Sequence, residues 1–210
     1  MRDEITAGFT MPAEYEKHAA TIMVFPERPG SWRNGAGPAQ EVFARIIREL
    51  AKVEKVYVAA SGRTRETAER MLKLSTAGAV NGAGLADGSG DCGNIVLLDI
   101  PTDDAWARDI APTFVKNRKT GEIAGINWRF NAWGGDFNGL YAHWERDDAF
   151  AKEFLRRTGY PCFDADPFVL EGGSIHSNGK GTVITTESCL LSKGRNPGLT
   201  KNEIENRLKA

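Results

Sequence analysis

A cluster of charged residues follows one of the most apolar runs of the chain. The stretch TDDAWARDIAPTFV (102–115) carries three carboxylates, an arginine and a tryptophan directly after NIVLLDIP (94–101). One interpretation is a solvated turn in which Arg108 pairs with an aspartate at the surface, worth at most about 1 kcal/mol. The other is a pocket wall for a cation, in which Asp109 accepts two parallel hydrogen bonds from a guanidinium and Trp106 stacks on it. The stretch by itself leaves both open.

Two further stretches have features of a pocket rim. FVLEGGSIHSNG (168–179) ends a predicted strand on Glu171, before a pair of glycines. A carboxylate there points into a rim where sites form, or is a solvated residue of a hairpin. His176 follows nearby, but a lone histidine is more often packed or exposed than a base. NWRFNAWGGDFNGLY (127–141) gathers aromatic residues around two glycines, which fits a pocket wall or ordinary packing.

The three cysteines, Cys92, Cys162 and Cys189, lack the setting of an activated nucleophile. Cys162 and Cys189 lie among apolar or aromatic neighbours, which favour the unreactive thiol, and Cys92 has no neighbouring cation. Their odd number, wide spacing and lack of a CxxC pair predict a reduced protein without disulfides or structural zinc. The sequence also lacks HExxH, GxSxG and any His/Cys/Asp cluster with metal spacing.

The composition is that of a soluble globular protein. The 210 residues are 41% hydrophobic and 26% charged, with a formal net charge of −1, which suffices for one large domain or two small ones. The charges form no basic patch for nucleic acid, and the longest apolar runs, about six residues, are too short to cross a membrane. The charged start MRDEITAGFT predicts no signal peptide. We therefore expect a cytoplasmic protein that binds neither nucleic acid nor membrane.

Hydrophobic periodicity predicts alternating strands and helices. The expected strands are 20–26, 55–61, 94–101, 111–117, 123–130, 161–169 and 181–188, and the expected helices are 37–55, 64–77, 146–159 and 199–210. In the first helix the apolar residues at helical spacing are Val42, Phe43, Ile46, Ile47, Leu50 and Val53. Thr64 is the expected N-cap of the second helix, and Thr200 with Glu203 matches a capping box. Glycine-rich 77–94 lacks GxxxxGK[ST] and is predicted to be a long mobile loop rather than a phosphate loop.

Five stretches together resemble the agmatine deiminases, within the guanidine-modifying superfamily that also includes bacterial peptidyl-arginine deiminases and arginine deiminases. They are MPAEYEKHAATIMVFPERPGSW, DDAWARDIAPTFV, FNAWGG, LEGGSIHSNGKGT and TTESCLLSKGRNPGLTKNEIE, and the likeness runs from Gly8 to the end. The resemblance implies an α/β fold, a pentein-type propeller of ββαβ modules with pseudo-fivefold symmetry. Chains of this family are much longer, so residues 1–210 would form a single incomplete deiminase domain with about three of the five modules.

The resemblance also implies a reaction and a set of site residues. Agmatine and water would give N-carbamoylputrescine and ammonia through a covalent amidino-cysteine, in putrescine and polyamine biosynthesis, without a metal or organic cofactor. Mapped onto this sequence, Asp109 would bind the guanidinium nitrogens, Trp106 would form a pocket wall, and Glu171 would orient and polarise the catalytic histidine. Burying a guanidinium requires such opposing carboxylates, because an unpaired buried charge is costly.

Two family motifs do not occur in this sequence. They are the H-x-D segment, with the catalytic histidine and a second guanidinium ligand, and the GGGNIHC segment with the nucleophile; in the similar GGSIH the histidine is followed by Ser177. We therefore expect the natural chain to continue past Ala210, and residues 1–210 alone to lack deiminase activity. A truncated non-catalytic homologue and a deiminase of peptidyl-arginine or arginine remain alternatives. His176 receives no role, and the oligomeric state, including a homo-oligomer, stays open.

Overall fold

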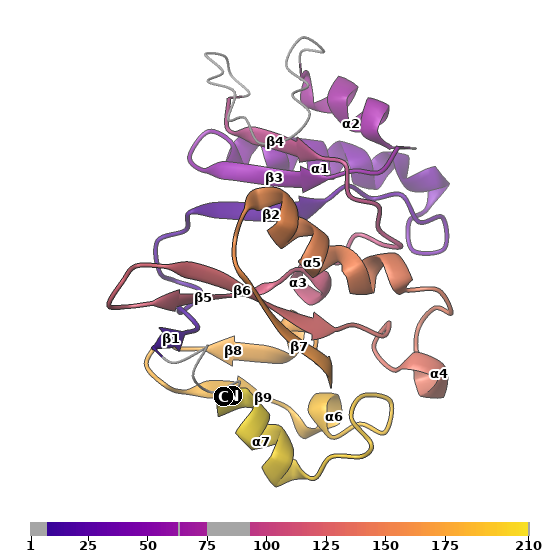
Figure 1. The fold of residues 1–210 in the computed structure, drawn as a ribbon. Coiled ribbons are helices and arrows are strands. Elements are labelled where there is room, and N and C mark those ends of the chain that lie inside the picture. Colours follow the sequence, from indigo (N-terminus) through magenta and orange to yellow (C-terminus); the bar gives the residue numbers. More distant parts are fainter. Residues whose placement is uncertain (1–7, 63, 75–92, 210) are drawn as a thin grey trace. The chain divides into compact units, whose positions relative to one another are not determined.

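The computed structural model describes residues 8–62, 64–74 and 93–209, which form mixed α/β structure (Figure 1). The chain divides into two compact units. One consists of Lys17–Ala107 and is called the 17–107 unit; the other combines Met1–Glu16 with Arg108–Ala210 and is called the 108–210 unit. A single domain over the whole chain stays a prediction. No helix in the described ranges is both long and apolar enough to cross a membrane.

The 17–107 unit is built on a parallel three-stranded sheet in the order β2-β3-β4. Its elements are β2 (Ala20–Val24), η1 (Asn34–Ala36), α1 (Gly37–Leu50), β3 (Lys55–Ala59), α2 (Arg65–Leu72) and β4 (Ile95–Leu98). Parallel neighbours need a crossover between them, which α1 supplies between β2 and β3. The core joins one side of α1 and α2 to the sheet through Phe25, Ile47, Val56, Val58 and Leu72. All three strands and both helices were predicted from periodicity.

Helix α1 buries a narrower face than its apolar residues suggest. Gln40, Ala44 and Ile47 are buried on it, whereas Val42 and Ile46 are exposed, as is Val53 beyond its end. The six apolar residues at helical spacing therefore do not all lie in the core. The apolar positions spread over a wide arc, and only the arc with small Ala44 packs close against the sheet. Pro38 lies in the first turn, where its missing N–H costs no helical hydrogen bond.

Helix α2 begins after Thr64 as predicted, but without the expected capping bond. Thr64 has near-helical φ and ψ of −106° and −9° and makes no side-chain cap hydrogen bond. A capping side chain needs extended backbone at this residue to reach the free N–H groups of the first turn. The loop predicted at 77–94 lies mostly outside the described residues, as does the end of the predicted helix 64–77.

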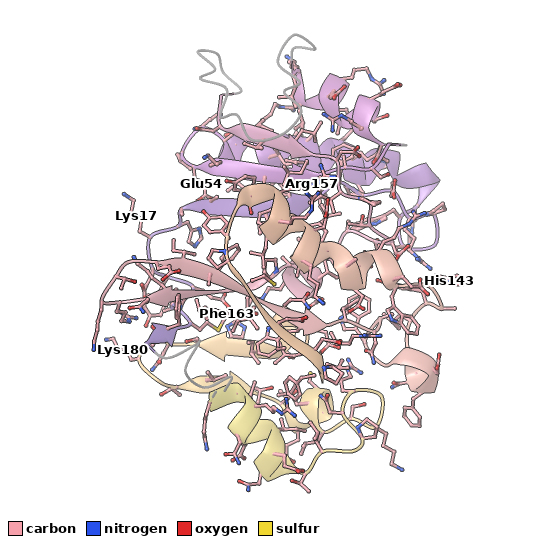
Figure 2. The ribbon with its side chains drawn as sticks, in the orientation of Figure 1. Lys17, Glu54, His143, Arg157, Phe163 and Lys180 are labelled. Atoms are coloured by element: carbon pink, nitrogen blue, oxygen red, sulfur yellow. The ribbon has the colours of Figure 1, made fainter. Side chains whose placement is uncertain are left out.

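The 108–210 unit contains a four-stranded sheet in the order β1-β5-β6-β7. Its first elements are β1 (Phe9–Thr10), α3 (Ala107–Ile110), β5 (Thr113–Asn117), β6 (Ile123–Arg129), α4 (Gly135–Asn138), α5 (Glu145–Thr158) and β7 (Cys162–Val169). Strands β5 and β6 pair antiparallel, and β6 and β7 pair parallel across α5. Phe163 of β7, labelled in Figure 2, meets Phe9 edge to face with ring centroids 5.1 Å apart. Helix α5 ends at left-handed Gly159, as predicted.

The last part of this unit packs a small hairpin and two helices around a second core. Its elements are η3 (Gly172–Ser174), β8 (Ile175–Ser177), β9 (Val183–Thr185), α6 (Glu187–Leu190) and α7 (Lys201–Lys209), drawn in orange and yellow in Figure 1. The core cluster consists of Phe168, Leu170, Ile175, Leu190 and Ile204. The capping box of α7 is confirmed, because Thr200 N donates to Glu203 Oε2 at 2.7 Å and Glu203 N to Thr200 Oγ1 at 3.3 Å. The strand predicted at 181–188 is shorter, since α6 begins at Glu187.

Candidate functional site

Asp109 lies in the short helix α3, between β4 and β5, rather than at the end of a strand. The side chain is half-buried, and each carboxylate oxygen accepts one hydrogen bond. Gly173 N donates to Oδ1 at 2.9 Å and Trp133 Nε1 donates to Oδ2 at 3.2 Å. Burial raises the pKa of Asp109, while these two donors and the nearby arginines oppose the shift. Two neutral donors, one on each oxygen, therefore hold this carboxylate in place.

Glu171 lies two residues after the end of β7 and is almost completely buried, with 2% of its surface exposed. Its Oε1 accepts a hydrogen bond from Arg195 Nε at 2.8 Å. Its Oε2 is also buried and has no hydrogen-bond partner among the residues that the structure describes. Burial raises the pKa of Glu171 most, Arg195 lowers it, and the charge of Asp109 raises it further. A buried carboxylate oxygen without a donor is costly, so Oε2 is a strong acceptor.

The structure therefore brings Asp109 and Glu171 into one part of the 108–210 unit. The peptide N–H that holds Asp109 belongs to Gly173, two positions after Glu171, and the two carboxylates influence each other electrostatically. A solvated Glu171 at a hairpin, one of the two interpretations of the sequence, does not agree with its burial. The two carboxylates share this part of the unit with the guanidinium groups of Arg108 and Arg195.

The glycine pair after Glu171 is required by close approach. A Cβ atom at Gly172 would collide with the carbonyl oxygen of Arg108, and one at Gly173 would collide with Asp109 Oδ1. Only glycine lets the backbone come this near to α3. In the structure this pair brings the backbone N–H of Gly173 to the carboxylate of Asp109.

The FNAWGG stretch supplies the second donor to Asp109. Ala132 and Trp133 have φ values of 53° and 64°, in the left-handed region that costs non-glycine residues energy. The Trp133 ring packs edge to face on Phe130 and on Tyr141, with centroids 5.1 and 5.9 Å apart. This packing fixes the indole N–H on Asp109. From the sequence alone, these aromatic residues fitted either a pocket wall or ordinary packing. The hydrogen bond from Trp133 to Asp109 was not predicted.

Arg108 links three segments of the unit. Its guanidinium donates to Gly172 O at 3.0 Å, to Ile175 O at 3.1 Å and to Glu14 Oε1 at 2.5 Å. The surface-turn interpretation paired Arg108 with a neighbouring aspartate, but its carboxylate partner is Glu14. Glu14 Oε1 also lies 3.2 Å from Nδ1 of His176, whose side chain is 65% exposed. His176, which the sequence left without a role, thus belongs to a surface cluster with Glu14.

A loop of residues 192–197 supports both carboxylates and was not identified from the sequence. Arg195 pairs with Glu171. Asn196 Nδ2 donates to Val169 O at 2.8 Å, and Val169 N donates to Asn196 Oδ1 at 3.0 Å. Asn131 Nδ2 donates to Gly194 O at 2.8 Å and so ties the loop to the turn that carries Trp133. The residues of this loop belong to the segment SKGRNPG, which is part of the last stretch that resembles the deiminases. No role was predicted for them.

A cleft of about 360 Å³ opens beside this loop. Its walls include Arg129, Asn131, Trp144, Lys193 and Arg195. Arg195 therefore belongs both to the cleft wall and to the pair with Glu171. Three of the residues that line the cleft are cationic, Arg129, Lys193 and Arg195, and one, Asp136, is acidic. Asp109 and Glu171 are not among the residues that line it.

Trp106, the predicted pocket wall, lies in the 17–107 unit and is 42% exposed. Its ring stacks on Trp32 with centroids 5.9 Å apart and planes 25° apart. Asp104 fixes both indoles, accepting from Trp32 Nε1 and Trp106 Nε1 at 2.9 Å each, from Ala105 N at 2.8 Å and from Ser31 Oγ. With 1% exposure, Asp104 is a structural acceptor that the sequence did not distinguish from its neighbours.

The described cysteines show no activated thiolate. Burial, with Asp164 next, raises the pKa of the Cys162 thiol, and Cys189 Sγ accepts a hydrogen bond from Thr186 Oγ1 at 3.2 Å. Cys92 lies outside the described residues. Within the described ranges, no group of three or more His, Cys, Asp or Glu side chains is placed to hold a metal ion.

Comparison with known proteins places this chain among deiminases. The family model described as Porphyromonas-type peptidyl-arginine deiminase matches residues 10–210. The agmatine deiminase of Pseudomonas aeruginosa (strain LESB58) is 47% identical over 202 residues, which cover 96% of this chain and 50% of that protein. The agmatine deiminase of Ectopseudomonas mendocina (strain ymp) is 47% identical over 198 residues, covering 94% of this chain and 49% of that protein.

A solved structure supports the same relationship. The agmatine deiminase of Enterococcus faecalis has a TM-score of 0.83 and 39% sequence identity, covering 96% of this chain and 50% of that chain. The likeness confirms the predicted α/β pentein fold class. The chain spans about half the length of the curated relatives that it matches. By its family match and these similarities, the chain belongs to the Porphyromonas-type peptidyl-arginine deiminase family.

Proposed function

We propose that this chain forms the guanidinium-binding part of an agmatine deiminase. The reaction replaces one guanidinium nitrogen by the oxygen of water, so agmatine yields N-carbamoylputrescine and ammonia. The observation that carries the proposal is the pair of half-buried Asp109 and buried Glu171, linked through the glycine turn at Gly173. A permanently charged, planar guanidinium is the natural partner of such a site. The relatives named agmatine deiminases give the substrate class.

Asp109 is proposed to bind two nitrogens of the guanidinium. Each carboxylate oxygen offers about two acceptor positions. Gly173 uses one on Oδ1 and Trp133 uses one on Oδ2, so each oxygen keeps capacity for a substrate N–H. That arrangement suits a two-point contact with a guanidinium. The raised pKa of Asp109 reflects burial that a bound cation would offset.

Glu171 is proposed to orient and polarise a catalytic histidine. Its Oε2 is a buried acceptor without a partner among the described residues, and an imidazole N–H would satisfy it. Such a contact favours the histidine tautomer and charge needed for proton transfer. The histidine, and the cysteine thiolate that attacks the guanidinium carbon and expels ammonia, would be supplied outside residues 1–210, whose sequence lacks both motifs.

Trp106 is proposed to form a wall of the substrate pocket. Its indole is held by Asp104 and stacked on Trp32, so the ring is fixed before any ligand arrives. A preorganised aromatic face binds a cation or an alkyl chain at low entropic cost. The proposed enzyme acts in the cytoplasm, in putrescine and polyamine biosynthesis, without a metal or organic cofactor, and its homo-oligomerisation is open.

Peptidyl-arginine or arginine is the alternative substrate, favoured by the description of the matching family. Agmatine lacks the carboxylate of arginine, so the residues around the far end of the substrate decide between them. A truncated homologue without activity is the second alternative.

An assay of the complete gene product distinguishes these possibilities. The protein is incubated with agmatine, arginine and a blocked arginine peptide, and released ammonia and the ureido product are quantified. We expect the highest kcat/KM for agmatine. A preference for arginine or for the peptide would overturn the choice of substrate, and turnover of none of them would favour the non-catalytic homologue. Residues 1–210 assayed alone should release no ammonia, and release would show that the nucleophile lies within this sequence.

A further inference from the structure

Glu171 and Arg195 form an almost completely buried ion pair within the 108–210 unit. The side chains are 3% and 10% exposed, and Arg195 Nε lies 2.8 Å from Glu171 Oε1. The two residues come from different segments, Glu171 from the end of β7 and Arg195 from the loop of residues 192–197. Removing one partner of a buried ion pair is costly, so the pair needs a reason to be kept.

The loop places Arg195 independently of its own side chain. Asn196 is bonded to both backbone groups of Val169, and Gly194 O accepts from Asn131 Nδ2. Arg195 N donates to Ser192 O at 3.0 Å, which closes a turn. The residue after Arg195 is therefore anchored to the end of β7, and the residue before it to the turn after β6. The guanidinium arrives in a fixed direction, at low cost in side-chain entropy.

We propose that Arg195 is a positioning residue that holds Glu171 by Oε1 and leaves Oε2 as the acceptor for the group that Glu171 serves. This inference rests on the proposed function of Glu171 and adds the residue that sets its direction. A carboxylate held at one oxygen cannot rotate freely, so its second oxygen points in one defined direction. The buried, unpartnered Oε2 is the direct sign of that arrangement.

The charges around Glu171 explain why an arginine is used. Burial and the charge of Asp109 both raise the pKa of Glu171, and Arg195 lowers it. Arg108 approaches from α3, where its guanidinium binds Gly172 O. Without Arg195 the carboxyl group would protonate at a higher pH, and a protonated carboxyl donates a hydrogen bond where an acceptor is required.

The first test is independent of catalysis. The side-chain carboxyl carbon of Glu171 is titrated by ¹³C NMR in the 210-residue chain, with its signal assigned by Glu171→Gln. In Arg195→Gln we expect the apparent pKa to rise by about one unit or more. In Arg195→Lys, which keeps the charge and loses the planar fork, the rise should be smaller. Arg156→Gln, which removes one of the two arginine partners of partly exposed Glu153, is the matched control and should leave the Glu171 signal unchanged.

The second test uses the pH profile of the complete gene product with agmatine. Arg195→Gln should shift the acidic limb of kcat/KM upward by the amount seen in the titration, and kcat should fall more than KM changes. A merely structural role would lower activity at every pH without moving the limb. An unmoved titration together with an unmoved limb would overturn the inference. If the complete protein turns over no guanidine, the proposed function fails while the titration still decides the role of Arg195.

A double variant covers the case in which Arg195→Gln does not fold. Glu171→Gln combined with Arg195→Gln replaces the ion pair by two neutral amides. We expect the double variant to unfold at a higher urea concentration than Arg195→Gln, because the uncompensated buried carboxylate is gone. If the double variant is no more stable than Arg195→Gln, the two side chains are not coupled and the proposal is wrong.

Discussion

Two aspartates of the same stretch illustrate how contacts decide which carboxylate is available. Asp104 accepts from Trp32, Trp106, Ala105 and Ser31 and is buried, so its acceptor positions are filled. Asp109 accepts one hydrogen bond on each oxygen from the described residues, from Gly173 and from Trp133. The first carboxylate therefore stabilises the local structure, and the second retains capacity for a ligand.

Changing Asp109 to Asn tests its proposed role as a guanidinium ligand. In the complete enzyme Asp109→Asn should lower kcat/KM for agmatine by about 10- to 150-fold, because a hydrogen bond to a charged group is worth about 1.5–3 kcal/mol. Steady-state kinetics measures this loss. Asp99→Asn, at an exposed position of the 17–107 unit, serves as the control with unchanged kinetics. Near-normal kinetics in Asp109→Asn would show that Asp109 has only a structural role.

Changing Asp104 to Asn tests the structural acceptor. The amide replaces one acceptor oxygen by a donor that faces either the pair Trp32 and Ala105 or the pair Ser31 and Trp106. We expect Asp104→Asn to lower the free energy of unfolding by about 1–3 kcal/mol. Urea unfolding followed by tryptophan fluorescence gives this value. Equal stability of variant and parent would mean that the four contacts contribute little.

At the scale of elements, the 192–197 loop and the turn after β6 act together on the site. The loop binds the end of β7 through Asn196, and it binds the turn that carries Trp133 through Gly194 and Asn131. Trp133 in turn donates to Asp109, and Arg195 to Glu171. The loop thus supports both carboxylates, although neither lies on it.

Changing Asn196 to Ala tests this support. Asn196→Ala removes both hydrogen bonds to Val169 and leaves a buried N–H and C=O without partners, so we expect a loss of about 1–3 kcal/mol in the free energy of unfolding. Hydrogen exchange at the Val169 amide should become faster, as detected by NMR. Asn202→Ala, at an exposed position of α7, is the matched control. Unchanged exchange at Val169 would contradict the supporting role of the loop.

At the scale of the whole molecule, carboxylates whose pKa is raised and carboxylates whose pKa is lowered change the pH dependence of stability with opposite sign. Burial raises the pKa of Asp109 above its ordinary value of 3.8. The hydrogen bond from Arg156, followed by contacts with Arg157, lowers the pKa of Glu153 from 4.5 to about 2. Nε of Arg157, a residue labelled in Figure 2, lies 2.5 Å from Glu153 Oε1. Stability rises with pH only where the unfolded chain binds more protons than the folded one.

The pH dependence of stability follows from these directions. Ionisation of Asp109 opposes folding as the pH rises through the window above 3.8, so Asp109→Asn should gain stability relative to the parent between acidic and neutral pH. Glu153 contributes stability above pH 4.5 that is lost as the pH falls towards 2, so Glu153→Gln should show the opposite trend. Urea unfolding at several pH values measures both slopes. Slopes of the same sign would contradict this assignment.

Sequence patterns predicted much of the fold because they depend on local periodicity. The parallel strands of the 17–107 unit, helix α5 with Gly159 at its end, and the Thr200–Glu203 capping box were all predicted correctly. The expected cap hydrogen bond of Thr64 is missing, and the residues of α1 that are buried could not be read from its spacing. Both depend on what packs against the helix, which the local pattern does not contain.

The sequence by itself determined the deiminase family and the carboxylates of interest, since five motifs in order identify both. Tertiary structure alone decided how those carboxylates differ in their surroundings. Asp104 is saturated by donors, Asp109 is half-satisfied by a turn 64 positions away, and Glu171 is fixed by an arginine 24 positions away. Hydrogen-bond saturation and burial are properties of atoms brought together by folding, so no reading of neighbouring residues could have assigned them.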